Sequence, residues 1–406
     1  MAFPWYVAKR YFKAKHRFAF ISLISRISIA GLAIGIAALI LTVSILSGFE
    51  TTLEEKLISF DGHIRLRYFL EQPMDKLPSL VKQLDDYEEI SSYAPYISHE
   101  AMIRTGSYTD GVVAEAVPDT ALTKVLGLSQ YITEGAIDFN NTDEAPGMVL
   151  STRLARKLQV GLGDKVALFS IQGVPGPRNF PRAKQFQIQA LYNTGMIEYD
   201  DVYCYIPFEA GQDLFKMEEQ AHGFILMLND ASIADPFSTQ LQNELGYPYY
   251  PRSWRESHAS LFAWFQSQQY PIVLVFGLIA VVAIFNIMST LMMIVMEKTK
   301  NIGLLKAVGS TNSSIMRIFV YNGLFIGFIG CFAGTSLGLL LGELQRRFNL
   351  LQLPADVYFM ASVPIEFNWE HILIINGVLM FFAVIASLYP SLRAAKREPV
   401  ETLTYE

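Results

Sequence analysis

The chain has 406 residues, of which 51% are hydrophobic and only 17% are charged, and its mean hydropathy is positive. This composition is too apolar for an ordinary water-soluble protein of this length, so a membrane protein is the first class to test. Residues 47–270 form the one long stretch of ordinary polarity, and they carry 17 basic and 30 acidic residues. An acidic region of this kind excludes nucleic acid as a partner.

Four charge-poor segments are long enough to cross the ~30 Å hydrocarbon core of a bilayer, which takes about 20 helical residues. They cover Ile27–Phe49, Ala259–Met296, Ile318–Gly342 and His371–Leu392. The first is too long for the hydrophobic part of a signal peptide and lacks a following A-x-A site, so we expect it to be retained. The sequence therefore predicts a multi-pass α-helical membrane protein with four transmembrane helices.

Basic residues in short flanking segments predict the orientation, because they accumulate on the cytoplasmic side. The segment before the first span has no acid and carries Lys9, Arg10, Lys13, Lys15, Arg17 and Arg26. The loop after the second span is also basic, whereas the segment after the third is mainly acidic. We therefore expect both termini and the loop at 297–317 in the cytoplasm, and the region between the first two spans on the other side.

These spans divide the chain into consecutive segments. In order, they are an interfacial cytoplasmic helix (1–20), the first span (21–48), an outer domain (49–269), the second span (270–296), a cytoplasmic helix (297–314), the third span (315–342), a short outer loop (343–370), the fourth span (371–392) and a cytoplasmic tail (393–406). The first segment mixes aromatic and basic residues, which favours a helix at the lipid surface; a disordered basic tail is the alternative.

The outer domain is predicted to have an α+β fold with two lobes. Alternating apolar residues predict strands at 63–68, 112–117, 166–171, 186–191, 202–206 and 223–228, and helical spacing predicts helices at 77–84, 152–158, 208–215 and 232–245. Phe49, Leu53, Leu57 and Phe60 recur at three- and four-residue spacing, so the first helix is expected to continue beyond the membrane. Cys204 and Cys331 lie in different phases, which excludes a disulfide between them.

One stretch of the outer domain is basic and rich in proline and glycine. It contains Gly173, Val174, Pro175, Gly176, Pro177, Arg178, Phe180, Pro181 and Arg182. It lies between two strand patterns, so it is expected to be the tip of an extended hairpin that is too stiff to join a sheet. It is interpreted either as a docking finger for a soluble partner or as an ordinary long loop.

Motifs for catalysis and for cofactor binding are missing. The sequence has no G-x-x-x-x-G-K-[ST], H-E-x-x-H, C-x-x-C or G-x-S-x-G pattern, and its six histidines have no metal-ligand spacing. The S-x-x-K pattern from Ser79 to Lys82 lies in a plain helical stretch and arises readily by chance. We therefore expect a protein that is not itself an enzyme and that holds no cofactor or metal.

A short amphipathic helix is expected on the cytoplasmic side after the second span. Its candidate functional residues are Glu297, Lys298, Ile302, Leu305, Val308 and Gly309. The three apolar residues are predicted to share one face, and Gly309 with Ser310 predicts a helix stop followed by a new N-cap. This helix is expected to pack either on the membrane surface or on a cytoplasmic partner.

Small residues follow one face of the third span at four-residue spacing. They include Gly323, Gly327, Gly330 and Gly334, and the first span has a similar face at Gly31 and Gly35. Such faces allow helices to approach closely in lipid. Asn286 in the second span is a polar residue near mid-membrane, which is expected to face protein or a cavity.

Several local motifs resemble one known family. They are Phe285-Asn286-Ile287, the stretch from Val295 to Gly309, Tyr389-Pro390-Ser391-Leu392-Arg393 with its continuation to Glu401, Ser47-Gly48-Phe49-Glu50, and Leu150-Ser151-Thr152-Arg153 with its continuation to Lys165. With the length and the order of spans, these motifs are similar to the LolC/LolE lipoprotein-releasing permeases. That family belongs to the MacB-like, FtsX-like class of mechanotransmitting ABC transporters.

The resemblance implies an inner-membrane protein with a periplasmic outer domain and a second permease subunit, either a copy or a paralogue. It implies a LolD-like ATPase subunit that binds ATP and magnesium and docks on residues 297–309. In the family, the acyl chains of the lipoprotein substrate enter from the membrane lipids between the first and second spans, near Phe49 and the small-residue faces. The 173–182 hairpin then corresponds to a dock for a LolA-like periplasmic chaperone.

Two other functions fit the same class of architecture. One is a MacB-like exporter or mechanotransmitter for peptides or drugs, and the other is a regulator that activates a periplasmic hydrolase. ATP-dependent release of a lipoprotein from liposomes would separate the lipoprotein-releasing function from both.

Overall fold

The computed structural model describes residues 4–7, 19–75, 77–106, 108–139, 145–171, 182–353, 360 and 362–396. The chain forms two compact units. The helical unit comprises 1–50, 265–351 and 363–406, and the sheet unit comprises 51–264 and 352–362. Each unit is described separately below.

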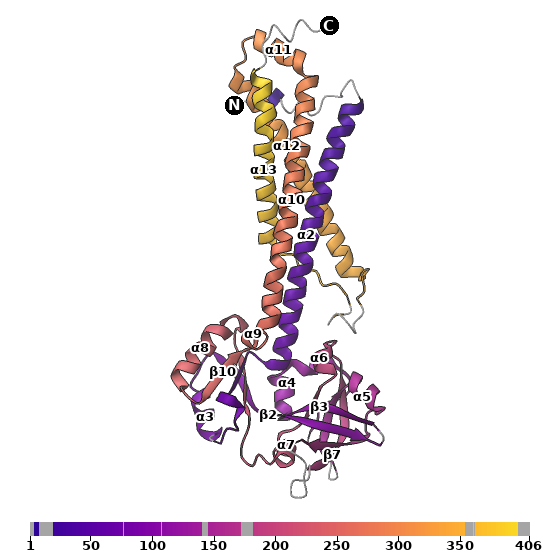
Figure 1. The fold of residues 1–406 in the computed structure, drawn as a ribbon, viewed down its shortest axis with the longest axis vertical. Helices are drawn as coiled ribbons and strands as arrows, with labels where there is room; N and C mark the ends of the chain where they lie inside the picture. Colours follow the sequence, from indigo (N-terminus) through magenta and orange to yellow (C-terminus); the bar gives the residue numbers. More distant parts are fainter. Residues whose placement is uncertain are drawn as a thin grey trace. The chain divides into compact units, whose positions relative to one another are not determined.

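Four long apolar helices form the framework of the helical unit (Figure 1). They are α2 (Ala19–Asp61), α10 (Ala259–Glu297), α12 (Asn312–Phe348) and α13 (Trp369–Lys396). Each is long enough to cross a bilayer, where a helix satisfies all of its own backbone hydrogen bonds. The prediction of four transmembrane helices is confirmed. As the apolar spacing predicts, α2 continues past the first span as far as Asp61.

Glycines allow α12 to approach α2 closely. A Cβ atom added at Gly334 would lie 2.6 Å from Cβ of Ile36, and one added at Gly330 would lie 2.4 Å from Cδ2 of Leu32. Real Cβ atoms essentially never approach so closely, so only glycine fits between the helices at these positions. This half of the glycine stripe therefore packs against α2.

The half of the stripe nearer the start of α12 packs against a different helix. A Cβ atom at Gly323 would lie 2.6 Å from Cβ of Ser387, and one at Gly327 would lie 2.8 Å from Cβ of Ala383. Both neighbours belong to α13. The glycines thus form two series, and each serves a different helix: Gly323 and Gly327 pack against α13, and Gly330 and Gly334 pack against α2.

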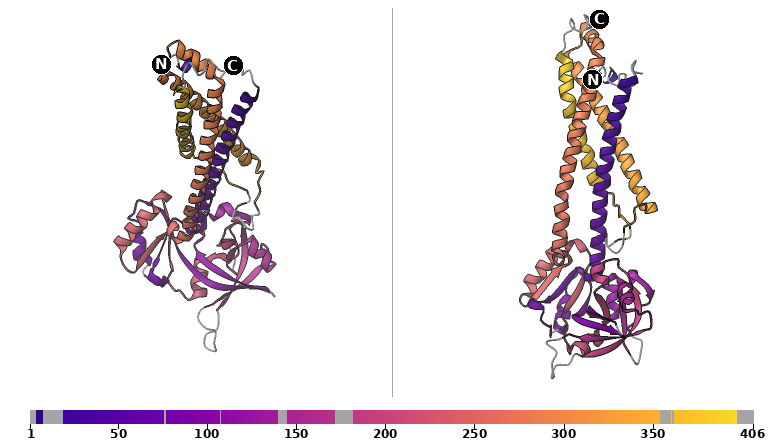
Figure 2. Two further views of the ribbon diagram at one scale, coloured as in Figure 1. Left: turned by 45° about the horizontal axis from the view of Figure 1, so that its top comes forward. Right: turned by 45° about the vertical axis from the view of Figure 1, so that its right-hand side comes forward.

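The sheet unit has an α+β fold, which confirms that prediction (Figure 2). Its strands are β1 (Ile64–Tyr68), β2 (Ile90–Thr105), β3 (Tyr108–Val117), β4 (Ile132–Gly135), β5 (Gly147–Ser151), β6 (Lys165–Ser170), β7 (Ala183–Tyr192), β8 (Tyr203–Pro207), β9 (Gly223–Leu228) and β10 (Tyr249–Ser253). Its α-helices are α3 (Leu77–Leu84), α4 (Asp119–Lys124), α5 (Thr152–Leu158), α6 (Ile197–Asp200), α7 (Phe208–Phe215), α8 (Ala234–Leu245) and α9 (Trp254–Ser257). The strand order is β10-β1-β9-β2-β3-β8-β5-β7-β4, with β6 paired to β2 and β7.

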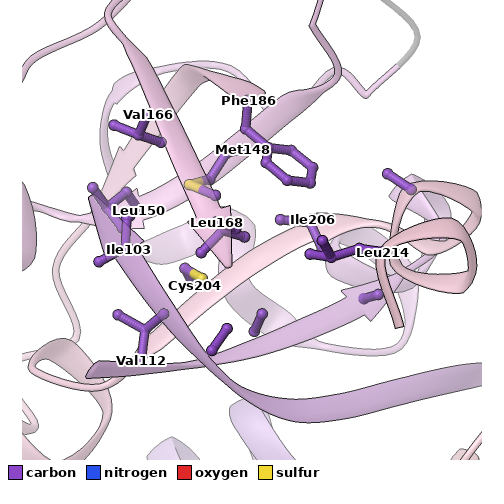
Figure 3. Close-up of a cluster of buried hydrophobic side chains, with 14 of the residues drawn as sticks. Ile103, Val112, Met148, Leu150, Val166, Leu168, Phe186, Cys204, Ile206 and Leu214 are labelled. Carbon is purple, nitrogen blue, oxygen red and sulfur yellow. The ribbon is translucent and has the colours of Figure 1, made fainter. Parts of the chain in front are cut away.

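The strand β2 belongs to two lobes with separate hydrophobic cores. Residues 90–96 of β2 pair with β9, whereas residues 97–105 pair with β3 and 101–104 also with β6. One core lies around Leu66, Phe224 and Leu241. The other lies around Leu150 and Phe186 and includes Cys204, as Figure 3 shows. The two lobes therefore share one continuous strand.

Candidate functional sites

An apolar cavity of about 330 Å³ lies in the helical unit. It is lined by Leu39, Val43, Leu46, Ser47 and Glu50 of α2, Gln269, Ile272, Val273 and Phe276 of α10, and His371, Ile374 and Ile375 of α13. Its volume is within the usual range for small-ligand sites. The cavity is formed by helices that are far apart in the sequence, so no local motif could have predicted it.

The polar residues of this cavity gather at one end. On α2, Ser47 and Glu50 follow the apolar lining residues; on α10 and α13, Gln269 and His371 precede them by about one turn. The chain direction of α10 and α13 is opposite to that of α2, so all these polar side chains lie toward the same end of the helices. The cavity therefore has an apolar part and a polar end, which suits an amphipathic ligand.

Polar side chains link α2 to α10 deeper in the helical unit. The hydroxyls of Ser28 and Thr290 lie 2.6 Å apart, and Nδ2 of Asn286 donates to the Ser28 carbonyl oxygen (3.3 Å). A Cβ atom at Gly31 would be 3.5 Å from the same Asn286 amide, and one at Gly35 would be 3.1 Å from a side chain of α10. The structure thus places Asn286 and both glycines at a packing contact, and they do not line the cavity. Phe49 is also absent from the lining.

The cytoplasmic helix of the sequence analysis is α11 (Thr299–Ala307). Ile302 is buried in a small core with Val295, Ile315, Phe319 and Ala394. Leu304 and Val308 are instead 60% and 81% exposed, respectively, while Leu305 is half-buried. The prediction that Ile302, Leu305 and Val308 share one face is therefore wrong.

The error has a geometric cause. A three-residue step turns only 300° around a helix, so two steps displace Val308 by about 120° from Ile302. The helix also ends at Ala307, and Gly309 adopts the positive φ of 99° that glycine tolerates best. The N-cap of α12 is Thr311 rather than Ser310, since the Thr311 hydroxyl accepts from the Ser314 N–H.

Other contacts fix the base of α11. Glu297 and Lys298 form an ion pair (2.8 Å), and Nζ of Lys306 donates to the carbonyl oxygen of Ala395 at the end of α13 (2.6 Å). The large apolar side chains that are exposed in α11 and at its C-cap are those of Leu304 and Val308. This pair forms an exposed apolar surface.

The proline-rich hairpin is mostly outside the described residues. Gly173, Val174, Pro175, Gly176, Pro177, Arg178, Phe180 and Pro181 belong to the part of the chain left out, and Arg182 is the described member. Arg182 donates to the backbone carbonyl of Asp213 (2.9 Å), and Lys184 binds the Asp213 carboxylate (2.6 Å). These contacts hold the base of the hairpin on α7.

A buried ionic network lies at the end of α2 within the sheet unit. Arg65 binds Asp61 (3.0 Å) and Glu115 (2.9 Å), and Asp61 also binds Nε2 of His258. The Glu115 side chain is only 1% exposed. Burial lowers the pKa of Arg65 and the charge of Glu115 raises it, with a net pKa well above the ordinary value. The network joins the last residue of α2, the residue before α10 and strands of both lobes.

Among the described residues, no group of three or more His, Cys, Asp or Glu side chains could hold a metal ion. Comparisons with known proteins place these features in a family. The MacB-like periplasmic core domain profile matches residues 25–244, more than half of the chain, and the FtsX-like permease C-terminal profile matches residues 273–399. The transmembrane protein LolC of the lipoprotein-releasing system of Neisseria meningitidis serogroup B is 30% identical over 99% of both chains.

The chain belongs to the LolC/LolE family. Its similarity to the LolC protein of Xylella fastidiosa is 29% identity over 98% of each chain, and to the LolE protein of Haemophilus influenzae 28% over 99% of each. The resemblance identified from local motifs is thus confirmed. A LolC/LolE protein is a multi-pass permease of the inner membrane, and the sheet unit is its MacB-like periplasmic domain.

Proposed function

We propose that this chain is the permease subunit of an ABC transporter that extracts lipoproteins from the outer leaflet of the inner membrane. A separate ATPase subunit supplies the energy, and a periplasmic chaperone receives the lipoprotein. Membership of the LolC/LolE family supports this proposal, because relatives of nearly equal length are named as parts of a lipoprotein-releasing system. Both termini and α11 are proposed to lie in the cytoplasm.

The observation that carries the proposal is the cavity with an apolar lining and polar residues at one end. Burial of acyl chains contributes about 0.8 kcal/mol per methylene group, so a lipid anchor with several chains is held by tens of kcal/mol. Passive release into water is therefore excluded. The chains must move from lipid into an apolar protein site, and the polar end of the cavity can accommodate the head of the anchor at the same time.

A change of Val43 to Trp is expected to fill the cavity and to block lipoprotein release. Val43 lines the cavity from α2, so the larger side chain displaces acyl methylene groups. Loss of two such groups costs about 1.6 kcal/mol, which lowers release roughly tenfold or more. The measurement is ATP-driven release of a lipoprotein from proteoliposomes that contain the permease and its ATPase.

Leu340→Trp is the control for this experiment, because Leu340 lies on α12, is 60% exposed and is not part of the cavity lining. Equal loss of release in both variants would contradict a role for the cavity. If the unaltered complex hydrolyses ATP but releases no lipoprotein, the proposed function itself is wrong and an exporter or a regulator of a hydrolase becomes the better explanation.

We further propose that the ATPase docks on the exposed pair Leu304 and Val308. The replacement Leu304→Glu is expected to lower permease-stimulated ATP hydrolysis roughly tenfold or more, since a central apolar contact of an interface contributes about 2 kcal/mol. Membrane insertion and folding are expected to be unchanged, because the Leu304 side chain is 60% exposed. Stimulation of the ATPase by reconstituted variants measures the effect.

Leu350→Glu is the control, because it adds the same charge at a side chain that is 63% exposed and lies beyond the other end of α12. Normal stimulation in Leu304→Glu would refute docking at this pair. The other candidate residues of this segment would then act only by positioning α11; they are Glu297, Lys298, Ile302, Leu305 and Gly309.

Two further partner surfaces belong to the proposal. In the most apolar stretch of α10, only 17% of the residues are buried within the chain, against 39% in the corresponding stretch of α2. The helix α10 therefore has the most surface left for a second permease subunit. The basic hairpin at 173–182 is proposed to dock the chaperone, with Arg182 and Lys184 fixing its base on Asp213.

A further inference from the structure

A second cavity, of about 470 Å³, lies in the sheet unit between the two lobes. Three arginines line it: Arg65 and Arg67 of β1 and Arg252 of β10. Side chains alternate across a strand, and Arg65 pairs directly with Arg252 in the antiparallel register, so all three lie on one face of the sheet. Ile64 and Leu66 lie on the opposite face, in the hydrophobic core.

This arrangement has an energetic cost. Like charges that lie directly opposite on neighbouring strands destabilise a sheet. Arg65 is compensated by the carboxylates of Asp61 and Glu115. The guanidinium of Arg252 donates to the backbone carbonyl of Glu256 (2.8 Å), which satisfies an N–H group but leaves the positive charge of Arg252 in place. Two carboxylates also line the cavity, those of Asp61, which is bound to Arg65, and Glu100.

Neutral polar side chains also line the cavity, beside the arginines and the two carboxylates. The rings of His99 and His222 also line the cavity, with their centroids 4.7 Å apart. Burial, followed by the charge of His99, lowers the pKa of His222 to about 4, so it is neutral at pH 7. Because Nδ1 of His222 accepts from the Ser98 N–H (3.0 Å), its proton resides on Nε2. Tyr96 and Tyr203 add hydroxyl groups to the lining.

We propose that this cavity binds a small oxyanion, namely a phosphate or carboxylate group on a compact polar molecule. The planar fork of arginine matches both groups, because it can donate two parallel hydrogen bonds to their oxygen atoms. The volume is in the range of small-ligand sites. The site is separate from the apolar cavity of the helical unit, and ligand binding to it can be measured without lipoprotein release.

The test uses the full chain in nanodiscs of zwitterionic lipid, titrated calorimetrically with inorganic phosphate and with citrate at constant ionic strength. Both Arg67→Gln and Arg252→Gln are expected to weaken binding of the preferred probe at least about tenfold, as for the loss of a charge-assisted hydrogen bond. Arg67→Lys, which keeps the charge and loses the fork, is expected to bind with intermediate affinity. Arg156→Gln, at an exposed arginine of α5, is expected to bind like the unaltered protein.

A second arm uses nanodiscs that contain phosphatidylglycerol. If this lipid competes with the soluble probe, the phosphate is supplied by a lipid headgroup; if it does not, the ligand is a soluble anion. Two negative results together would overturn the proposal. Neither probe would bind in zwitterionic discs, and phosphatidylglycerol would change the thermal stability of the unaltered protein no more than that of Arg252→Gln. Equal weakening in Arg156→Gln would do the same.

Discussion

Replacing Arg65 with Met is expected to lower the stability of the sheet unit by about 3–5 kcal/mol, because a buried carboxylate is left without its partner. Glu115 is almost fully buried and binds Arg65 directly. For a domain of this size, the loss corresponds to a fall in Tm of roughly 6–20 °C. Thermal unfolding of the full chain in detergent, followed by near-UV circular dichroism, measures it. Arg104→Met, at an exposed arginine of β2, should shift Tm by less than about 2 °C.

Lower pH is expected to reduce the effect of the Arg65→Met change. Burial raises the pKa of Glu115 above its ordinary value, and Arg65 opposes this shift. Without Arg65, the pKa of Glu115 in the folded state rises further above its value in the unfolded chain. The loss of folding stability is therefore complete at high pH and decreases as the pH falls toward the folded-state pKa of Glu115. The Tm difference between variant and unaltered protein should therefore shrink between about pH 8 and pH 5.5. A constant difference would mean that Glu115 is not the source of the instability.

The exchange Gly334→Ala is expected to destabilise the packing of α12 on α2 by about 1–3 kcal/mol. The new Cβ atom would lie 2.6 Å from Cβ of Ile36 and 2.7 Å from the backbone oxygen of Ala33, so one helix must move. The measurement is again thermal unfolding of the full chain, read from a probe in the helical unit.

A glycine with open space around it gives the opposite expectation for the change in stability. A Cβ atom at Gly377 of α13 would meet no atom within 4 Å, and alanine is a better helix former than glycine by about 1 kcal/mol. Gly377→Ala is therefore expected to leave stability unchanged or to raise it. If Gly334→Ala and Gly377→Ala lower the Tm equally, the close approach at Gly334 does not stabilise the bundle.

The four long helices could be predicted from sequence because their apolar length is set by the bilayer, and α3, α5 and α7 could be predicted from helical spacing. Strand β2 was missed although it is the longest strand of the sheet. Pro95 and the polar residues around it interrupt the alternation. Short strands such as β5 and β10 were also missed: β5 is buried on both sides, and β10 contains a proline.

The candidate sites were predicted only in part. The polar character of Asn286 and Thr290 was visible in the sequence, but their partner Ser28 was not, because it lies in another helix. The apolar cavity of the helical unit takes its lining from three helices, and the cavity lined by Arg65, Arg67 and Arg252 depends on the register of β1 against β10. Both are products of tertiary packing, which local spacing does not encode.

The continuity of β2 has a consequence for how the periplasmic domain unfolds. Its 16 residues carry backbone hydrogen bonds into both lobes. Melting either lobe alone would leave half of the ladder on β2 without partners, so the two cores should be lost in a single cooperative transition. The slowest-exchanging amide protons of the domain should accordingly lie along this strand on both sides of Tyr96.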